Sequence, residues 1–202
     1  MDHSEEQASM ITIAELNGAD VKKYAEFYRK ASDFPIALQT DYLEQCELVR
    51  IFLNDGEIIG GYVLNSKAPL RFSQCVDDAS KYMEVFEDAI ELVALAVTYK
   101  SKPFRLFFYY TMTYDVLRIL LEAKKKWILG CTTVEKLRKF NSHALPHDLF
   151  VGNIRGQTYY VFYGDFGSWM RGAVSGVPDA LKIPQAMRKI GIKLLRKNSK
   201  AA

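Results

Sequence analysis

The most constraining stretch of the chain runs from residue 91 to residue 133, where the hydrophobic period changes twice. Residues 92–97 form a short apolar run with β-branched members, which is typical of a strand buried on both faces. From residue 104 to residue 126, apolar side chains recur every three or four positions and predict an amphipathic helix. Residues 127–130 are apolar again. This pattern predicts a strand–helix–strand unit with parallel strands and a right-handed crossover.

Three cations, Lys100, Lys102 and Arg105, lie beside the predicted start of this helix. A helix N-terminus presents N–H groups without intrahelical partners and a partial positive charge, so it favours an anion. The sequence therefore predicts an anion site at this turn. A solvated charged loop before a core helix is the alternative.

The flanking segments predict two β-hairpins, because in each case apolar runs surround a short turn that contains glycine. The hairpins cover residues 47–65 and 149–163. Gly60 and Gly61 lie inside a predicted strand and indicate a bulge or a close approach of another segment. Further predicted elements are a strand at residues 11–16 and helices at residues 21–31, 40–45, 80–89 and 134–141.

The length of 202 residues suits one domain without structural staples. An odd number of cysteines without paired spacing indicates reduced thiols, and hence a cytoplasmic protein. The first ten residues are acidic and polar rather than a signal peptide, and no apolar run is long enough to span a membrane.

The net charge of +3 hides a gradient along the chain. Residues 1–96 hold 8 Lys or Arg and 18 Asp or Glu, residues 97–165 hold 11 and 5, and residues 166–202 hold 8 and 1. An anionic partner should therefore meet the second half. Residues 180–197 read as a basic amphipathic helix that can contact a membrane surface or an acidic partner. The alternatives are packing on the acidic N-terminal half and a solvated end. Nucleic acid is not expected, because this segment lacks aromatic interleaving.

The order strand, helix, helix, hairpin, strand, helix, strand, helix, hairpin resembles the GNAT superfamily of N-acyltransferases. The run Glu91-Leu92-Val93-Ala94-Leu95-Ala96-Val97 is similar to the family's fourth strand, which precedes a basic phosphate-binding turn. GYVLNSKAPLRF followed by ELVALAV also resembles the branch with N-acyl amino acid and acyl-homoserine-lactone synthases. The resemblance implies an α+β domain in residues 1–165, with a mixed, strongly bent sheet flanked by helices on both faces. Residues 166–202 would then be a basic extension.

The resemblance implies transfer of an acyl group from a thioester donor, acyl-CoA or an acyl carrier protein, to a small-molecule amine. In the family, a glycine-containing turn lets backbone amides approach the pyrophosphate of coenzyme A. Here the turn reads KSKPFRLFFYY, with Arg105 at the place of the family's arginine and Lys100 and Lys102 supplying charge. The alternative is a GNAT-like module that binds coenzyme A or acyl carrier protein without turnover.

The resemblance also nominates catalytic residues. Leu95, Ala96 and Val97 would meet the donor, with a backbone N–H near Ala96 or Val97 facing the oxyanion. Glu91 is the candidate base, and its alternative is a surface carboxylate at the start of a strand.

Two tyrosines and one cysteine complete the candidate set. Tyr159 and Tyr160 are candidate acids for the leaving thiolate, and their alternative is hairpin packing. Cys131 lies at the end of the next strand as a possible nucleophile, against the alternative of a buried, inert thiol. His143 and His147 are four residues apart, but Pro146 interrupts a helix there, so no metal site is expected.

Aromatic residues are dense at the start of the central helix: Phe104, Phe107, Phe108, Tyr109, Tyr110 and Tyr114. One hypothesis is that some of them line a pocket for an acyl chain longer than acetyl. The alternative is that they pack against the first two helices and fill the space.

Overall fold

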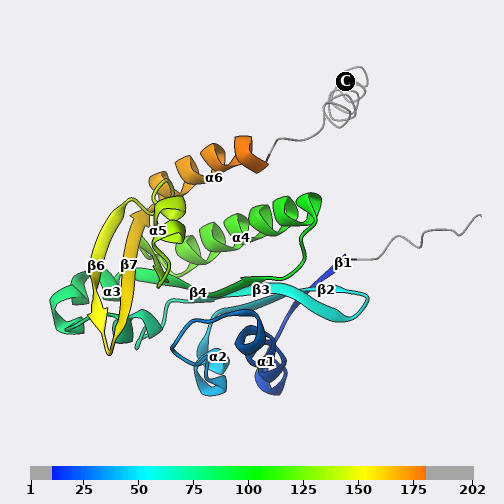
Figure 1. Ribbon diagram of the computed structural model, residues 1–202, viewed down its shortest axis with the longest axis horizontal. Coiled ribbons are helices and arrows are strands. Elements are labelled where there is room, and N and C mark those ends of the chain that lie inside the picture. Colours follow the sequence, from blue (N-terminus) through cyan, green and yellow to red (C-terminus); the bar gives the residue numbers. More distant parts are fainter. Residues whose placement is uncertain (1–10, 181–202) are drawn as a thin grey trace, which may run out of the picture.

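A mixed seven-stranded sheet with strand order β1-β2-β3-β4-β5-β7-β6 organises the computed structural model, which describes residues 11–180 (Figure 1). The strands are β1 (Ile11–Glu15), β2 (Leu48–Asn54), β3 (Glu57–Asn65), β4 (Ala89–Val97), β5 (Trp127–Thr132), β6 (His147–Ile154) and β7 (Gln157–Asp165). Only the β4–β5 pair is parallel, as the strand–helix–strand pattern predicted. The expected α+β class with a mixed sheet is confirmed, whereas a strong bend of the sheet stays a prediction.

Helices cover both faces of the sheet. The helices are α1 (Val21–Ala31), α2 (Thr40–Gln45), α3 (Met83–Glu87), α4 (Lys102–Glu122), α5 (Glu135–Asn141) and α6 (Phe166–Ala180), with short 3-10 helices η1 (Gly18–Asp20), η2 (Arg71–Cys75) and η3 (Ala79–Tyr82). Figure 1 shows α1 and α2 on one face and α4 and α6 on the other. We call these the α1 face and the α4 face.

Both predicted hairpins form, and each turns through two left-handed residues. Asp55 and Gly56 have φ values of 50° and 87°, and Arg155 and Gly156 have φ values of 53° and 84°. Two adjacent residues with positive φ match the right-handed twist of the paired strands, which is why such turns join them tightly.

The C-terminal part of the chain begins with a packed helix. Trp169 of α6 is 5% exposed, and the Tyr109 hydroxyl of α4 donates a hydrogen bond to the backbone carbonyl of Gly172 over 3.3 Å. The predicted amphipathic helix at residues 180–197 lies outside the described residues, apart from Ala180 at the end of α6. The division of the chain at residue 165 stays a prediction.

Aromatic packing fixes α4 on its face of the sheet. Phe104 and Phe108 are 2% and 5% exposed, and the Phe108 ring lies 4.8 Å from Phe52 and 5.5 Å from Tyr62, between centroids. These two α4 rings therefore fill a core against β2 and β3. They do not contact α1 and α2, which lie on the opposite face.

A buried carboxylate ties the middle of α4 to the same two strands. Asp115 is 1% exposed and accepts hydrogen bonds from Arg50 Nε at 2.9 Å, Arg50 Nη2 at 3.2 Å and the Tyr62 hydroxyl at 2.7 Å. This bidentate contact between the Asp115 carboxylate and the Arg50 guanidinium orients both side chains. It also offsets the cost of removing the carboxylate from water.

Asp115→Ala should leave Arg50 and Tyr62 without their shared acceptor. We expect the free energy of unfolding to fall by about 3 kcal/mol, because one buried partner then keeps an uncompensated charge. Glu122→Ala on the same helix is the control, since that side chain is 59% exposed and should change stability by no more than about 0.5 kcal/mol. Urea denaturation measures both, and equal losses would contradict a special role for Asp115.

Candidate functional site

The candidate site lies where β4 and β5 separate. The parallel pairing joins only Ala89 to Trp127, Ile90 to Ile128 and Glu91 to Leu129. Beyond this point β4 continues beside β3 as far as Val97, and β5 continues beside β7 as far as Thr132. The two strands therefore diverge toward their C-terminal ends, next to the start of α4.

A bulge in β4 accompanies this separation. Val93 pairs with Val63 and Ala96 with Gly61, so Ala94 and Leu95 together oppose one residue of β3. Ala94 has a φ of 52°, a left-handed conformation that an L-residue seldom adopts. A bulge of this kind bends its strand and redirects its side chains.

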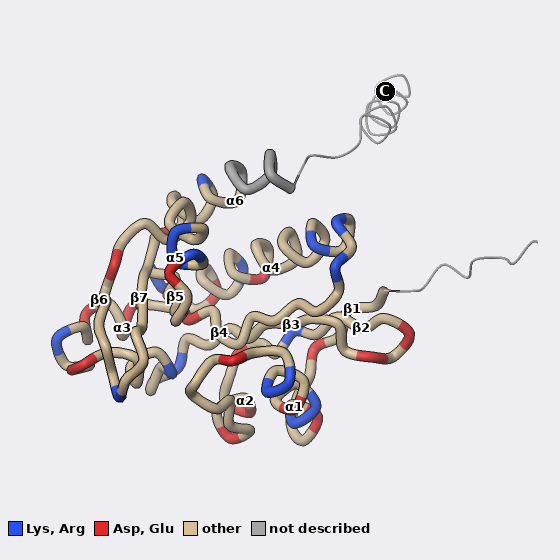
Figure 2. Tube along the Cα trace, in the orientation of Figure 1, with Lys and Arg blue, Asp and Glu red and all other residues tan. Residues whose placement is uncertain are grey.

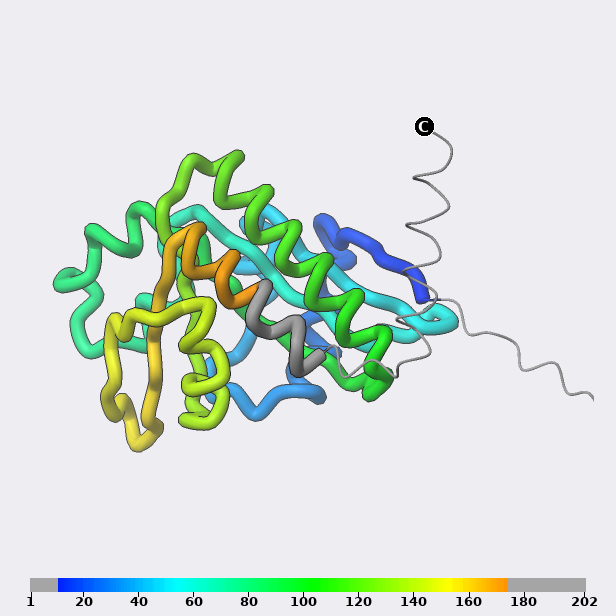
Figure 3. Tube along the Cα trace, turned by 90° about the horizontal axis from the view of Figure 1, so that it is seen from above, coloured from blue at the N-terminus to red at the C-terminus, as the bar shows by residue number. Residues whose placement is uncertain are grey.

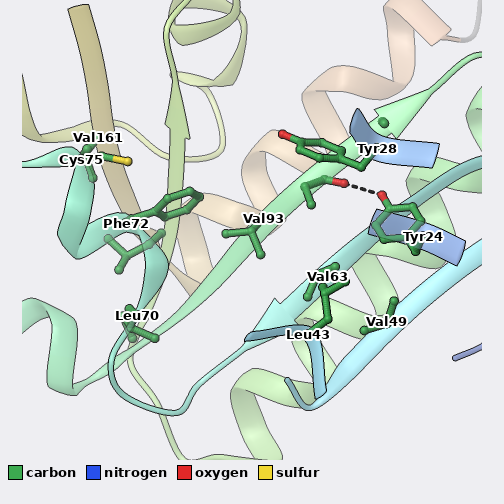
Figure 4. Close-up of a cluster of buried hydrophobic side chains, with 14 of the residues drawn as sticks. Tyr24, Tyr28, Leu43, Val49, Val63, Leu70, Phe72, Cys75, Val93 and Val161 are labelled. Atoms are coloured by element: carbon green, nitrogen blue, oxygen red, sulfur yellow. Dashed lines mark hydrogen bonds between the residues drawn. The ribbon is translucent and has the colours of Figure 1, made fainter. Parts of the chain in front are cut away.

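A tyrosine of α1 holds the bulge. The buried Tyr24 hydroxyl donates a hydrogen bond to the backbone carbonyl of Ala94, drawn as the dashed line in Figure 4. Gly61 makes room for this ring, since a Cβ atom there would lie 2.5 Å from Tyr24 Cε2 and 2.5 Å from the Arg50 carbonyl oxygen. The sequence predicted a bulge or a close approach at Gly60 and Gly61. The close approach is confirmed at Gly61, and β3 itself also shifts register between Ile58 and Gly60 in its pairing with β2.

The end of β4 is more exposed than the sequence predicted. Leu95 and Val97 are 49% and 37% exposed, whereas Ala96 between them is 7% exposed. The expectation of a strand buried on both faces is therefore wrong for these last residues, because β5 no longer lies beside them. Their exposure leaves apolar surface at the end of β4, beyond its pairing with β5.

The anion site predicted before α4 has exposed cations and few free amides. Lys100, Lys102 and Arg105 are all exposed, and none forms an ion pair among residues 11–180. Ser101 is the N-cap residue but makes no side-chain hydrogen bond to the helix, and Pro103 in the first turn has no N–H to offer. An anion at the N-terminus of α4 would therefore be bound mainly by the charges of these side chains rather than by backbone amides.

Glu91 is fully buried, at 0% exposure, and accepts four hydrogen bonds. Oε1 accepts from the Tyr42 hydroxyl at 2.5 Å, from Asn65 Nδ2 at 3.1 Å and from the Arg71 N–H at 2.8 Å, while Oε2 accepts from the Phe72 N–H at 3.0 Å. Burial raises the pKa of Glu91 above its usual value, and these donors offset part of the rise. The alternative of a surface carboxylate is excluded, and the arrangement favours a carboxylate that positions its neighbours.

The candidate acids point to opposite faces, because consecutive strand residues alternate. Tyr159 is 5% exposed and belongs to the core on the α1 face, whereas Tyr160 packs with the core on the α4 face. Glu91 and Cys131 are also on the α1 face. The structure therefore brings Glu91, Cys131 and Tyr159 to one side of the sheet and leaves Tyr160 on the other.

Cys131 contacts a second thiol. The proximity of Cys75 and burial raise the pKa of Cys131 well above its usual value. Figure 4 places Cys75 beside Val161, which is the partner of Cys131 across β5 and β7. A thiol with a raised pKa stays protonated and is a poor nucleophile, so this environment favours the inert alternative. Burial likewise raises the pKa of Tyr159, which holds its proton and can donate a hydrogen bond.

Arg71, the first residue of η2, is a further candidate that the sequence alone did not indicate. It is 4% exposed, its Nη2 donates to the Ile36 carbonyl, and its guanidinium lies 5.2 Å from the centroid of the Phe34 ring. Its Nε is buried without a hydrogen-bond partner, and no carboxylate among residues 11–180 forms an ion pair with it. A buried cation without a counter-ion is costly, so it indicates a site for an anionic group. No local sequence pattern distinguishes this arginine from a solvated one.

Two adjacent hollows are both lined in part by Ile36, whose carbonyl oxygen accepts a hydrogen bond from Arg71. One has a volume of about 560 Å³ and is lined by residues that include Pro35, Ile36, Gln74, Arg155 and Tyr159. The other, of about 490 Å³, lies along the end of α1 and shares Pro35 and Ile36 with the first. The first hollow therefore brings Tyr159 and Ile36, the hydrogen-bond partner of Arg71, around one space.

Residues 11–180 contain neither a metal-binding cluster nor a membrane-spanning helix. No group of three or more His, Cys, Asp or Glu side chains there is arranged to hold a metal ion. Within the same residues, no helix has both the length and the apolar character needed to cross a membrane.

In comparisons with known proteins, no family model and no curated protein matches the sequence. Solved structures match the fold. FeeM, an N-acyl amino acid synthase from uncultured soil microbes, gives a TM-score of 0.59 at 12% identity, over 81% of this chain and 94% of FeeM. The AHL synthase LasI gives 0.50 at 11% identity, over 77% and 89%.

A putative acetyltransferase of the GNAT family from Desulfovibrio desulfuricans gives a TM-score of 0.50 at 8% identity, over 77% of this chain and 99% of that chain. Identities this low show a shared fold. The chain therefore has the fold of the GNAT acyltransferases, as the order of its predicted elements and the run at residues 91–97 indicated.

Proposed function

We propose that this protein transfers an acyl group from a thioester, carried by coenzyme A or an acyl carrier protein, to an amine. The observation that carries the proposal is the separation of β4 and β5 beside the basic start of α4. An extended thioester arm fits an opening between strands, and its phosphate fits the cations at the end of that opening. Exposed Leu95 and Val97 offer apolar contact to the arm.

For the acceptor, we propose an amine that also carries a carboxylate. Arg71 supplies the buried positive charge, and the hollow beside Tyr159 supplies the space. FeeM, an N-acyl amino acid synthase, has a similar fold and adds support. A carboxylate in contact with Arg71 would neutralise a cation that otherwise has no ion-pair partner among residues 11–180.

Acyl transfer needs the amine to lose a proton, the oxyanion to be stabilised and the leaving thiolate to be protonated. In our proposal a backbone N–H near Ala96 or Val97 meets the oxyanion, and Tyr159 donates a hydrogen bond on the acceptor side. Glu91 positions η2, and with it Arg71. Water accepts the proton that the amine loses and supplies the proton for the leaving thiolate. The base role that the resemblance implies for Glu91 is the competing assignment.

A second candidate function is binding of coenzyme A or acyl carrier protein without turnover. The glycine-free turn with Pro103 in the first turn of α4 favours it, because few backbone amides can approach a pyrophosphate there. Mixing the protein with acyl-CoA donors of two to sixteen carbons, with and without candidate amino acids, separates the two functions. Release of free thiol that depends on the amine supports the transferase, and donor binding without thiol release supports the module.

Arg105→Ala tests the donor site. Loss of one charge-assisted contact with phosphate should weaken donor binding by about tenfold, with a larger effect at low salt. Titration calorimetry with coenzyme A measures this. Lys22→Ala is the matched control, since Lys22 is also exposed but lies on α1, on the opposite face of the sheet. Equal donor affinity in Arg105→Ala and the wild type would remove this turn from the donor site.

Glu91→Gln separates a positioning role from a base role. The glutamine side-chain amide would place its own N–H group opposite a backbone N–H that now donates to the carboxylate, and two donors cannot pair. A positioning role therefore predicts a loss of about 2 kcal/mol in the free energy of unfolding. A base role predicts instead unchanged stability and donor affinity, about a hundredfold lower turnover, and loss of the acidic limb of the pH–rate profile. Denaturation and turnover measured on one preparation distinguish these outcomes.

Because burial raises the pKa of Glu91, this residue should also make the stability of the fold depend on pH. Its pKa is higher in the folded protein than in the unfolded chain, so the folded state keeps a proton where the unfolded chain has lost it. The free energy of unfolding should therefore fall as pH rises from the usual carboxyl pKa through the raised one. Glu91→Gln should remove this part of the slope. Urea titrations between about pH 4 and pH 8 measure it, and identical slopes would contradict the raised pKa.

Arg71→Gln tests the acceptor carboxylate. The substitution removes the charge but keeps hydrogen-bonding capacity, so KM for an amino acid acceptor should rise by about tenfold or more while donor affinity stays the same. The methyl ester of the same amino acid is the control, since its KM should not change. A rise for both acceptors would show that Arg71 only supports the fold of η2.

A further inference from the structure

Helix α4 is apolar on two opposite sides, and only one of them is buried. Its inner side packs on β2 and β3 through rings such as Phe104 and Phe108. Its outer side carries exposed apolar residues at spacings of three, four and seven, which place them along one line of the helix, with the partly exposed Arg118 between Tyr114 and Leu121 on the same line. This outer stripe consists of Phe107 (44% exposed), Tyr110 (50%), Tyr114 (67%) and Leu121 (66%).

No described element covers the outer stripe. Figure 3 shows α6 running alongside α4, where Trp169 is buried against the same core and Tyr109 reaches Gly172. The stripe remains exposed despite this neighbour, although the Phe107 ring also packs on Phe52 of β2, 5.9 Å away between centroids. A helix that is apolar all round is normally buried, and a contiguous exposed apolar patch marks an interaction site.

Cations lie at both ends of the outer stripe. Lys102 and Arg105 are exposed at the start of α4, and Lys124 and Lys126 are exposed just after its end. Figure 2 shows basic segments at the start of α4. The exposed carboxylate of α4 is Glu122, which pairs with Arg118. The second half of the chain is also strongly basic, with 19 Lys or Arg and 6 Asp or Glu after residue 96.

These charges decide between possible occupants of the stripe. A second copy of the chain would bring two basic surfaces together, which opposes association. A bilayer with anionic headgroups complements the cations at both ends, and its interface accommodates Phe, Tyr and Leu side chains.

We propose that the outer stripe of α4 docks this protein on the surface of an anionic lipid bilayer. The aromatic and leucine side chains enter the headgroup boundary, and Lys102, Arg105, Lys124 and Lys126 contact anionic headgroups. The docking is peripheral and does not depend on acyl transfer. The basic sequence after residue 180 adds charge to the same half of the chain.

The test is co-sedimentation of the full chain with vesicles of phosphatidylcholine alone or with about 30% phosphatidylglycerol. We expect binding only to the anionic vesicles, and binding should weaken as salt rises. The double variant Tyr110→Ser, Leu121→Ser should bind about tenfold less, because two apolar side chains no longer enter the boundary. Val151→Ser is the control, since Val151 is 54% exposed on β6, away from α4.

Each result decides the proposal. Equal binding of the double variant and the wild type would overturn it by assigning membrane contact to another segment. Failure of the wild type to bind anionic vesicles would overturn it directly. A dimer that light scattering detects, and that the double variant abolishes, would assign the stripe to a second copy. Circular dichroism and denaturation of the variants confirm that these exposed substitutions leave the fold intact.

Discussion

The buried carboxylate of Glu91 is the interaction on which the site depends. It joins the start of β4 to the end of β3 through Asn65, to α2 through Tyr42, and to η2 through two backbone N–H groups. In the low dielectric of the interior these hydrogen bonds are strong, and leaving any of the donors unpaired would be costly. Four segments that are distant in sequence are thus fixed around one side chain.

A second constraint shapes the other end of β4. The parallel pairing stops at Glu91, and the bulge that follows is held by Tyr24 from α1. Gly61 is necessary because any side chain there would collide with the Tyr24 ring and a strand carbonyl. The carboxylate therefore fixes the strand where it is paired with β5, and the tyrosine fixes it where it is not. The opening between the strands lies between these two anchors.

Local patterns in the sequence predicted most of the elements. Turn chemistry and hydrophobic period are local signals. They correctly predicted the hairpin turns at residues 55–56 and 155–156, the helix α1 and the strand–helix–strand unit. The predicted helix at residues 104–126 was too long, since α4 ends at Glu122 and Lys124 adopts a φ of 54°. The predicted helix at residues 80–89 is divided into η3 and α3.

The site was less predictable, because its decisive contacts are non-local. Burial of Glu91 requires hydrogen-bond donors that lie 19 to 49 residues away along the chain, and no periodic pattern in the sequence predicts these donors. Arg71 looks solvated in sequence and is buried in the structure. The opposite orientations of Tyr159 and Tyr160 follow from strand alternation, but only once the register of β7 is known. The exposure of Leu95 and Val97 likewise follows from the separation of β4 from β5, which the spacing of residues in the sequence does not predict.

The central helix joins the two proposals through shared cations. In our proposals Lys102 and Arg105 contact the phosphate of the donor, and they also lie at the end of the outer stripe that meets the bilayer. Anionic headgroups would therefore compete with the donor for the same charges, and salt would weaken both contacts. The apolar contacts are separate, since Leu95 and Val97 lie at the exposed end of β4 whereas Tyr110 and Leu121 lie on α4. Substitutions in the stripe can thus change membrane binding without changing the donor site, whereas substitution of a shared cation changes both.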